Sequence, residues 1–310
     1  MASVPEGRAG PAVGRRAALD LPPARTRWRW PRALLANPKA MVGLGILLAV
    51  VFCAVAAPWL APADPNAQVL DDRLLEPLAV GRNGVLHLLG TDHLGRDVLS
   101  RVLYGSRVSL LVGLAAVLLA GTVGISLGLV AGYRGGRVDD AVMRLADMQL
   151  ALPFILAATF IAAVLGPGLQ NTILVLGINS WVAYARVVRV GTLSVREKEY
   201  VLAARALGQR DLPIAWRHVL PNVSSPIIVI ATFAVAQTML AEAALTFLGL
   251  GTPVAIPSWG GMLSEARNYM TIAWWDAAFP GLAITITVIG INLLGDWLRD
   301  YLDPKNRDLV

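Results

Sequence analysis

The sequence predicts an all-α polytopic membrane protein with six transmembrane helices. Of its 310 residues, 56% are hydrophobic and only 15% are charged, and the mean hydropathy is +0.60. This composition is too apolar for an ordinary soluble domain. Its uncharged runs are long enough for helices of about 20 residues, the length that crosses a hydrocarbon core about 30 Å thick. The net charge of +6 does not indicate a nucleic-acid partner, because the basic residues lie in the gaps between these runs.

The distribution of arginine and lysine predicts the orientation. Twenty-one basic residues fall in the N-terminal tail, in the gaps after the second and fourth spans and at the C-terminal end, against six on the other side. Basic loop residues stay preferentially on the cytoplasmic side of a membrane. Both termini and the gap after the fourth span, which alone holds seven basic residues, are therefore predicted to be cytoplasmic.

Residues 1–39 are rich in Pro, Gly, Ala and Arg without periodicity, which predicts a disordered basic tail. Residues 40–63 are predicted to form the first transmembrane helix. A cleaved signal peptide is the alternative, because Ala54, Val55 and Ala56 have the form of a signal-peptidase site, but the long tail and the length of the run favour a membrane helix. The single cysteine, Cys53, lies in this run, which excludes an intrachain disulfide.

Residues 64–107 are predicted to be an extracytoplasmic segment with an amphipathic interfacial helix before the second span. Arg101 and Arg107 are interleaved with apolar residues, as is typical of a helix lying at a membrane surface. Asp92, His93 and Asp97 could ligate a metal. A solvated cap and helix face explains them better, since no further ligands are spaced for a closed site, and we predict no metal.

Residues 108–304 are predicted to hold the other five helices. Gly124, Gly128 and Gly132, in the second span (108–133), have the small-xxx-small spacing that lets two membrane helices approach closely, although glycine is also common in such helices generally. The uncharged stretch 148–185 exceeds one crossing, so it predicts spans three and four with a hairpin at residues 166–168.

Within and beside the third span, two further features are expected. Pro153 is predicted to kink this span. Asp147, at its start, is predicted to be an interfacial residue near Arg144 rather than a proton carrier.

Residues 194–222 form a polar island between apolar runs. Ser194 and Glu197 have the form of a capping box for a helix that ends near Leu207. Gly208 would then break the chain, and Asp211 would cap a second short helix ending at Leu220. The residues predicted to form a docking surface here are Glu199, Ala203, Ala204, Arg205, Gly208, Asp211, Leu212, Pro213, Arg217, His218, Leu220 and Pro221. The alternative is a basic segment lying on anionic lipid.

Span five (218–241) and span six (277–295) complete the set, followed by a C-terminal tail at 305–310. Glu242 follows span five, and because a charge inside a span is costly, it is predicted to lie at the outer boundary or in a water-filled cavity, as a candidate gate or substrate contact. Tryptophans 259, 274 and 275 suit a membrane interface.

The polar island resembles the EAA loop of ABC importer permeases. The resemblance is carried by Ala203, Ala204 and Gly208 in the pattern AAxxxG, followed by Leu220 and Pro221. Leu202 stands where that family has its first Glu, and His218 where an apolar residue is usual. The wording RHVLPN at 217–222, together with 89–110 and 292–304, is similar to the dipeptide, oligopeptide and nickel branch, and the resemblance covers residues 37–304.

This resemblance implies a type I ABC importer permease fold in the bacterial cytoplasmic membrane. It implies that the loop docks on one of two ATPase subunits, which would hold ATP and Mg²⁺, and that a second homologous permease and an extracytoplasmic substrate-binding protein complete the importer. The chain itself has no GxxxxGK[ST] phosphate loop, so it is not predicted to bind ATP. No catalytic residue, cofactor or metal is expected in it, and membrane lipid is its other partner.

The substrate is left open between short peptides, which we favour, and nickel or another metal chelate. Two other classes of function are weighed against the importer. An ion-coupled secondary transporter would be expected to carry ionisable residues in mid-membrane. A membrane enzyme would need a cluster of catalytic groups at one face, which the three scattered histidines His87, His93 and His218 do not supply.

Overall fold

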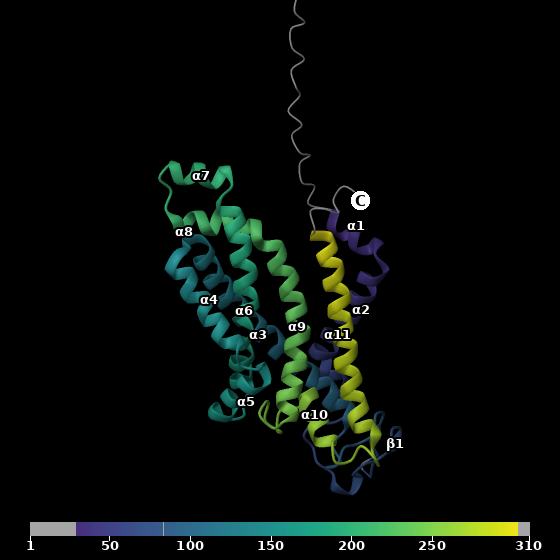
Figure 1. Ribbon diagram of the computed structural model, residues 1–310. Coiled ribbons are helices and arrows are strands. Elements are labelled where there is room, and N and C mark those ends of the chain that lie inside the picture. Colours follow the sequence, from purple (N-terminus) through teal and green to yellow (C-terminus); the bar gives the residue numbers. More distant parts are fainter. Residues whose placement is uncertain (1–28, 83, 303–310) are drawn as a thin grey trace, which may run out of the picture.

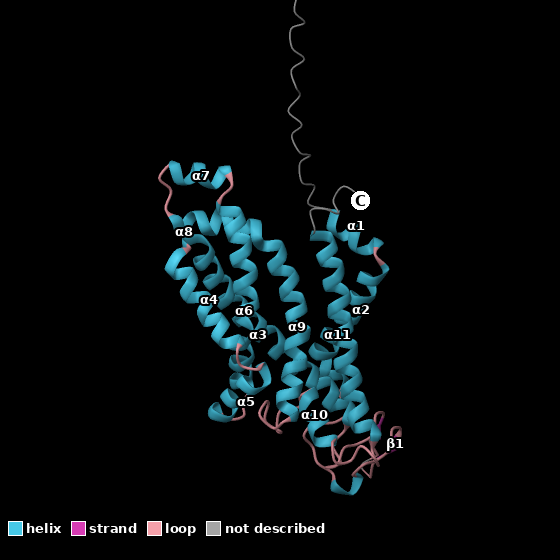
Figure 2. Ribbon diagram, in the orientation of Figure 1, coloured by secondary structure: helices cyan, strands magenta, loops and turns pink. Residues whose placement is uncertain are grey.

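The computed structural model describes residues 29–82 and 84–302, and helices dominate this part of the chain (Figure 2). The long helices run lengthwise through the molecule (Figure 1). The short helix α7 (Glu199–Ala206) lies at one end, and α10 (Trp259–Ala266) lies at the other. We refer to these as the α7 end and the α10 end.

Two helices form the N-terminal part of the described chain. Helix α1 (Arg29–Ala36) is followed by α2 (Pro38–Leu60), whose cap is Asn37: its side-chain oxygen accepts from the Ala40 amide at 3.1 Å. The prediction of disorder up to residue 39 is therefore wrong for α1. The composition of the tail did not indicate this short amphipathic helix, whose Leu34 packs on Trp297. Residues 1–28 of that tail, and the tail at 305–310, lie outside the described residues.

A short irregular segment leads to the longest helices. It contains the 3₁₀ turn η1 (Leu70–Asp72) and a two-stranded antiparallel hairpin of β1 (Ala79–Val80) and β2 (Leu86–His87). Helix α3 (Val98–Arg134) then runs without a break for 37 residues. The predicted interfacial helix is thus not a separate element but the first turns of α3, because nothing in the sequence near Val108 interrupts the backbone hydrogen bonds.

Helices α4 (Gly136–Leu150) and α5 (Phe154–Leu165) form a bent pair with an angle of 89° between them. Pro153 precedes α5, and since proline disfavours the helical conformation in the residue before it, the break falls at residues 151–153. A turn with Gly166 at φ 80° leads into α6 (Leu169–Arg196). Asp147 lies one helical turn from Arg144 in α4, near it as predicted. Its carboxylate accepts from Arg186 of α6 at 2.5 Å.

From Asp211 to Phe247 the chain forms helical turns without interruption. Helix α8 (Asp211–Ile214), the π-helical turn η2 (Ala215–Val219), the 3₁₀ turn η3 (Leu220–Val223) and α9 (Ser224–Phe247) follow one another directly. The predicted second short helix is therefore the first part of the fifth span. The sequence predicted a break at Pro221, because proline lacks the N–H that an α-helix needs. In the structure the backbone changes to π-helical and then 3₁₀ turns there, so the missing N–H does not end the helix.

Helix α10 is followed by α11 (Trp274–Leu302). Among the described residues, five helices are long and apolar enough to span a membrane, and α4 with α5 gives a sixth if the bent pair is one span. Of the tryptophans predicted to lie at the interface, Trp259 and Trp275 are buried in the core between α9, α10 and α11, while Trp274 is exposed; their depth in the membrane stays a prediction.

Helices α3 and α6 meet along the glycines at 124, 128 and 132. A Cβ atom added to Gly128 would lie 2.9 Å from the Cα of Ala185, and one added to Gly132 would lie 2.8 Å from the Cβ of Thr192. Real Cβ atoms do not approach other carbons so closely, so only glycine permits this contact between the two helices.

Candidate functional site

The candidate site is the segment of α7 and α8 at the α7 end. Helix α6 runs through Ser194 to Arg196, and α7 begins at Glu199 after Lys198, with no side-chain cap. The predicted capping box is therefore wrong, because Ser194 lies within a helix whose packing against α3 overrides the local signal. Helix α7 ends at Ala206, and Gly208, two residues later, has a φ of 77°, a left-handed conformation that glycine adopts at little cost.

Tyr133, near the end of α3, ties this segment to the bundle. Its hydroxyl donates to the Asp211 carboxylate at 3.1 Å, and the Arg205 guanidinium lies 5.4 Å from the centre of its ring. Asp211 is thus not the predicted cap: it is the first residue of α8, with no cap from a side chain, and it is used for a tertiary contact. One side chain of α3 therefore positions both halves of the elbow around Gly208.

An apolar core lies beneath α7, α8 and η2. Val201, Ile214 and Val219 are fully buried against residues of α3 and α6, including Leu129 and Val188. Burying a side chain of this size stabilises a fold by about 1.5–3 kcal/mol. The outer surface of the segment thus rests on a packed base.

The outer surface of the segment combines bulky apolar side chains with basic ones. Leu207 is 88% exposed and Trp216 is 50% exposed, and Leu212 and Leu202 are also exposed. Arginine side chains stand beside them in the same segment, at positions 205, 210 and 217. Exposed apolar groups with a polar surround are typical of a surface that binds another protein.

A second polar group of residues lies at the α10 end, around Glu242. This carboxylate is fully buried, and it accepts from Thr246 at 2.9 Å, from Thr252 at 3.3 Å and from Ser109 at 3.4 Å. These hydroxyl groups belong to α3, to α9 and to the loop that follows it, so Glu242 joins these elements. Its position at the outer boundary or in a water-filled cavity, and its role as a gate or substrate contact, stay predictions.

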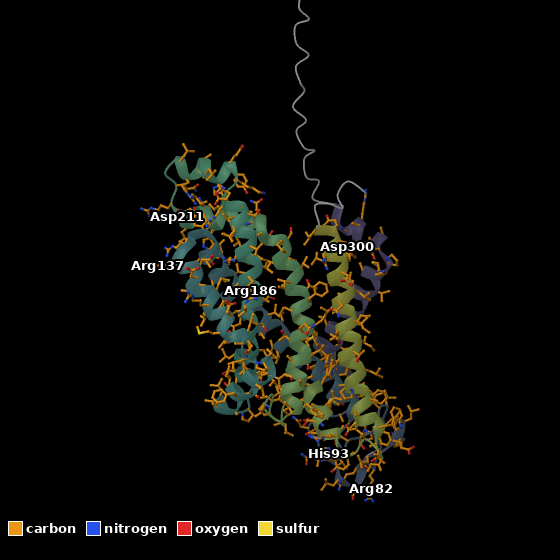
Figure 3. All side chains as sticks on the ribbon, viewed as in Figure 1. Arg82, His93, Arg137, Arg186, Asp211 and Asp300 are labelled. Carbon is orange, nitrogen blue, oxygen red and sulfur yellow. The ribbon has the colours of Figure 1, made fainter. Side chains whose placement is uncertain are left out.

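The loop before α3 holds a buried ionic cluster. The Asp92 carboxylate accepts from Arg96 and from Arg101, each at 2.6 Å, and Glu265 of α10 accepts from the same two arginines at 2.8 and 2.6 Å. Asp97 pairs with His87 at 2.9 Å. The predicted cap is present, because the Asp97 carboxylate accepts from the Ser100 amide at the start of α3, but it is buried and not solvated. The metal-site alternative is unsupported, since the carboxylates already accept from protein groups. Figure 3 shows His93 at this end of the molecule and Asp211 at the other.

Two family models match the chain. Residues 124–308 match the binding-protein-dependent transport system inner membrane component family. Residues 26–77 match the N-terminal TM domain of oligopeptide transport permease C. The chain belongs to this family of ABC transport permeases.

The permease has close relatives over most of its length. It is 46% identical to the di/tripeptide transport system permease protein DppC of Pseudomonas aeruginosa, over 87% of this chain and 89% of that protein. It is 42% identical to the dipeptide transport system permease protein DppC of Alkalihalophilus pseudofirmus, over 88% of each. It is also 42% identical to the glutathione transport system permease protein GsiD of Pectobacterium atrosepticum, over 91% and 92%. The permease is a multi-pass protein of the bacterial inner membrane.

The predicted docking residues gather on one side of the permease's α7 end. Eight of them are exposed, namely Glu199, Ala203, Arg205, Gly208, Asp211, Leu212, Arg217 and Pro221. The other four, which are Ala204, Pro213, His218 and Leu220, are half-buried. The glycines at 124, 128 and 132 lie elsewhere, in the α3–α6 contact, and Glu242 lies at the α10 end.

Sequence reasoning missed two residues of this surface, Leu207 and Trp216, and the buried Tyr133 that supports it. Leu207 and Trp216 are apolar residues within a polar island, and that contrast was a usable signal for an exposed binding group. Tyr133 had no such signal, because it is 78 residues from Asp211 in the sequence and only the packing of α3 brings the two together.

Proposed function

We propose that this permease is the membrane-spanning subunit of an ATP-driven importer of short peptides, and that its α7–α8 segment is the docking surface for an ATPase subunit. The substrate class is supported by the relatives, whose names describe di- and tripeptide, dipeptide and glutathione transport. These names favour peptides over a nickel chelate. The docking role is supported by the exposed apolar and basic surface described above.

The observation that carries the proposal is the continuity from α8 to α9. From Asp211 to Phe247 the chain is helical for 37 residues, about 55 Å at 1.5 Å per residue, whereas the left-handed Gly208 separates α7 from it. A partner that moves α8 would therefore tilt α9 as one body. Since α9 reaches Glu242 at the other end, such a tilt changes packing on both sides of the membrane.

The remaining parts of the importer follow from this role. The permease would supply half of the translocation path and would need a second, homologous permease for the other half. Two ATPase subunits would hold ATP and Mg²⁺, and an extracytoplasmic binding protein would deliver the peptide. The permease itself would supply no catalytic group and bind no cofactor or metal. Its α7 end would face the cytoplasm.

The test is Gly208→Arg with Gly84→Arg as the matched control. Both glycines have a left-handed backbone (φ 77° and 72°) and open space around them, so the conformational cost of an arginine is similar, but they lie in the α7–α8 segment and in the β1–β2 turn respectively. We expect Gly208→Arg to lose the co-purifying ATPase subunits and at least about tenfold of ATP-driven peptide uptake, equivalent to about 1.4 kcal/mol of docking free energy. Gly84→Arg should retain the ATPase subunits.

Two results would contradict the proposal. One is a Gly208→Arg complex that keeps its ATPase subunits and the parental rate of uptake. The other is a parent protein that purifies alone and imports peptides into liposomes without ATP, which would make it a secondary transporter.

A further inference from the structure

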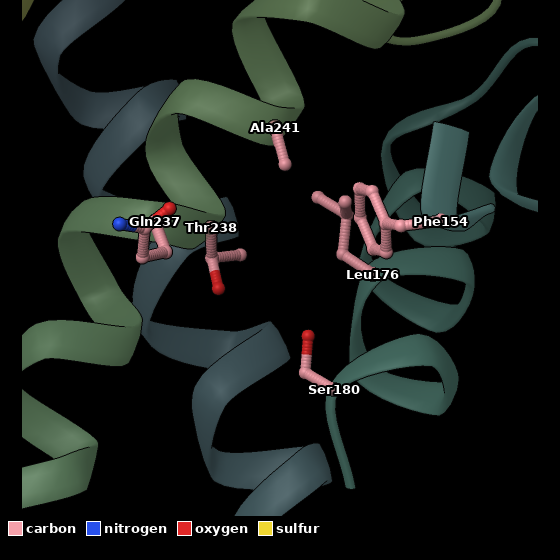
Figure 4. A pocket seen from close by; sticks show the side chains of 6 residues that line it. All are labelled: Phe154, Leu176, Ser180, Gln237, Thr238 and Ala241. Carbon is pink, nitrogen blue, oxygen red and sulfur yellow. The ribbon is translucent and has the colours of Figure 1, made fainter. Parts of the chain in front are cut away.

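A cavity of about 250 Å³ lies between α5, α6 and α9 (Figure 4). Helix α5 contributes the residue directly after its bend, and α9 contributes three residues from the turns before Glu242. The lining residues are Phe154, Leu176, Ser180, Gln237, Thr238 and Ala241. No charged side chain lines the cavity among the residues that the structure describes.

Three of the lining side chains are polar and have no protein partner. The hydroxyls of Ser180 and Thr238 and the amide of Gln237 make no hydrogen bond to any described residue; Thr238 is only 4% exposed, Ser180 is half-buried and Gln237 is exposed. Figure 4 shows Ser180 on α6 and Thr238 on α9 on opposite sides of one opening, with Gln237 beside Thr238. These groups are therefore available to hydrogen-bond water or a ligand that enters the cavity.

Other polar side chains of the bundle differ in this respect. Tyr184 and Thr192 of α6 are buried without a partner among the described residues, whereas Gln149 of α4 and Thr232 of α9 bond within the protein. The Gln149 amide nitrogen donates to the carbonyls of Ile178 and Asn179, and its oxygen accepts from Trp181 at 2.7 Å. Thr232 of α9 donates to the carbonyl of Ile228 at 2.9 Å.

We propose that this cavity is a subsite for a segment of the transported peptide, with its backbone amide bonded to Thr238, Gln237 and Ser180 and a small apolar side chain against Phe154 and Leu176. This inference rests on the proposed function. An amide group offers both a donor and an acceptor and carries no charge, which matches hydroxyl and amide partners in an uncharged site. The cavity is smaller than the roughly 300–1,000 Å³ of sites for drug-sized ligands, so it would hold one or two residues.

The position of the subsite links it to the proposed tilt of α9 by the ATPase subunit. Gln237, Thr238 and Ala241 belong to the continuous body that begins at Asp211, while Phe154 belongs to α5 beyond the 89° bend. A tilt of α9 would move one wall of the cavity against the other. The subsite would then hold the peptide in one state of the transporter and release it in the other.

The first test compares Thr238→Val with Thr232→Val in the complete transporter reconstituted in liposomes. Both changes remove one hydroxyl from α9 without changing side-chain volume much, but Thr232 already bonds to its own helix. We expect Thr238→Val, and Gln237→Leu as a second variant, to lower trialanine uptake per ATP hydrolysed by about fivefold to tenfold, the loss of one net hydrogen bond. Thr232→Val should stay within twofold of the parent.

The second test uses thiol labelling, because Cys53 is the only cysteine of the chain. In a Cys53→Ser background, Ser180→Cys should react with a small methanethiosulfonate reagent, and trialanine delivered by the binding protein should slow this reaction at least fivefold. Parental uptake in both Thr238→Val and Gln237→Leu, or labelling of Ser180→Cys unchanged by trialanine during transport, would overturn the subsite alone. A parent complex that imports no peptide would overturn the proposed function together with the subsite.

Discussion

At the scale of single residues, the ionic cluster before α3 shows how burial changes the meaning of a charge. Arg101 is almost fully buried and donates both to Asp92 and to Glu265, each at 2.6 Å. A buried charge that loses its partner is strongly destabilising, whereas an exposed ion pair contributes little. Buried and exposed ion pairs are made by the same residue types, so the sequence alone does not distinguish them.

Replacing Arg101 should therefore be far more costly than replacing Arg82. We expect Arg101→Met to lower the free energy of unfolding by about 3–5 kcal/mol, because Arg96 alone would then have to compensate the charges of Asp92 and Glu265. Arg82→Met, which breaks only the exposed pair with Asp71, should cost less than about 1 kcal/mol. Thermal unfolding of the detergent-solubilised protein measures both, and equal effects would show that the cluster is not buried.

His93 gives the loop a predicted pH dependence. Burial lowers the pKa of His93 below its ordinary value, more strongly than Asp92 and Glu265 raise it. Since the unfolded chain then binds the proton more readily, this contribution to stability is present above about pH 6.5 and is lost as the pH falls through the lowered pKa. His93→Phe, which retains a ring to stack on Tyr269, should reduce the loss of thermal stability between pH 7 and pH 5. An unchanged pH profile would contradict this assignment.

At the scale of elements, the effect of enlarging a glycine depends on whether it faces another helix. We expect Gly128→Leu to separate α3 from α6 and to cost about 1–3 kcal/mol or more, because a Cβ there already meets the backbone of Ala185. Gly45→Leu in α2 should be close to neutral, since nothing lies within 4 Å of its added Cβ. The yield of monodisperse protein and its unfolding temperature test the pair, and a stable Gly128→Leu protein would refute the close contact.

Helix boundaries at this scale follow from competition between local and tertiary signals. Ser194 and Glu197 have the spacing of a cap, yet α6 continues past Ser194, because Thr192 and Val195 are buried. Pro221 has the form of a stop, yet η2 and η3 carry the helix past it, and the Asn222 side chain donates to the carbonyl of His218 at 2.7 Å. Such cases need the position of neighbouring helices, which no local pattern contains.

At the scale of the whole molecule, the orientation in the membrane is still a prediction from charge. In a Cys53→Ser background, Gly208→Cys should react with a membrane-impermeant maleimide only after the cytoplasmic face is made accessible. Arg82→Cys, with a side chain exposed at the opposite end, should react in intact spheroplasts. The reverse pattern of labelling would invert the predicted topology.

The sequence by itself determined the class of the protein, its membrane segments, the family and the place of the elbow at Gly208. These depend on composition, on the length of apolar runs and on short motifs, all of which are local properties of the chain. Only the tertiary structure decided that Tyr133 holds Asp211 and Arg205, that Glu242 is enclosed by hydroxyls, and that Thr238 and Ser180 share a cavity. Those relations join residues of different helices, and the physical cost of burying a polar group is set by the partners that packing brings to it.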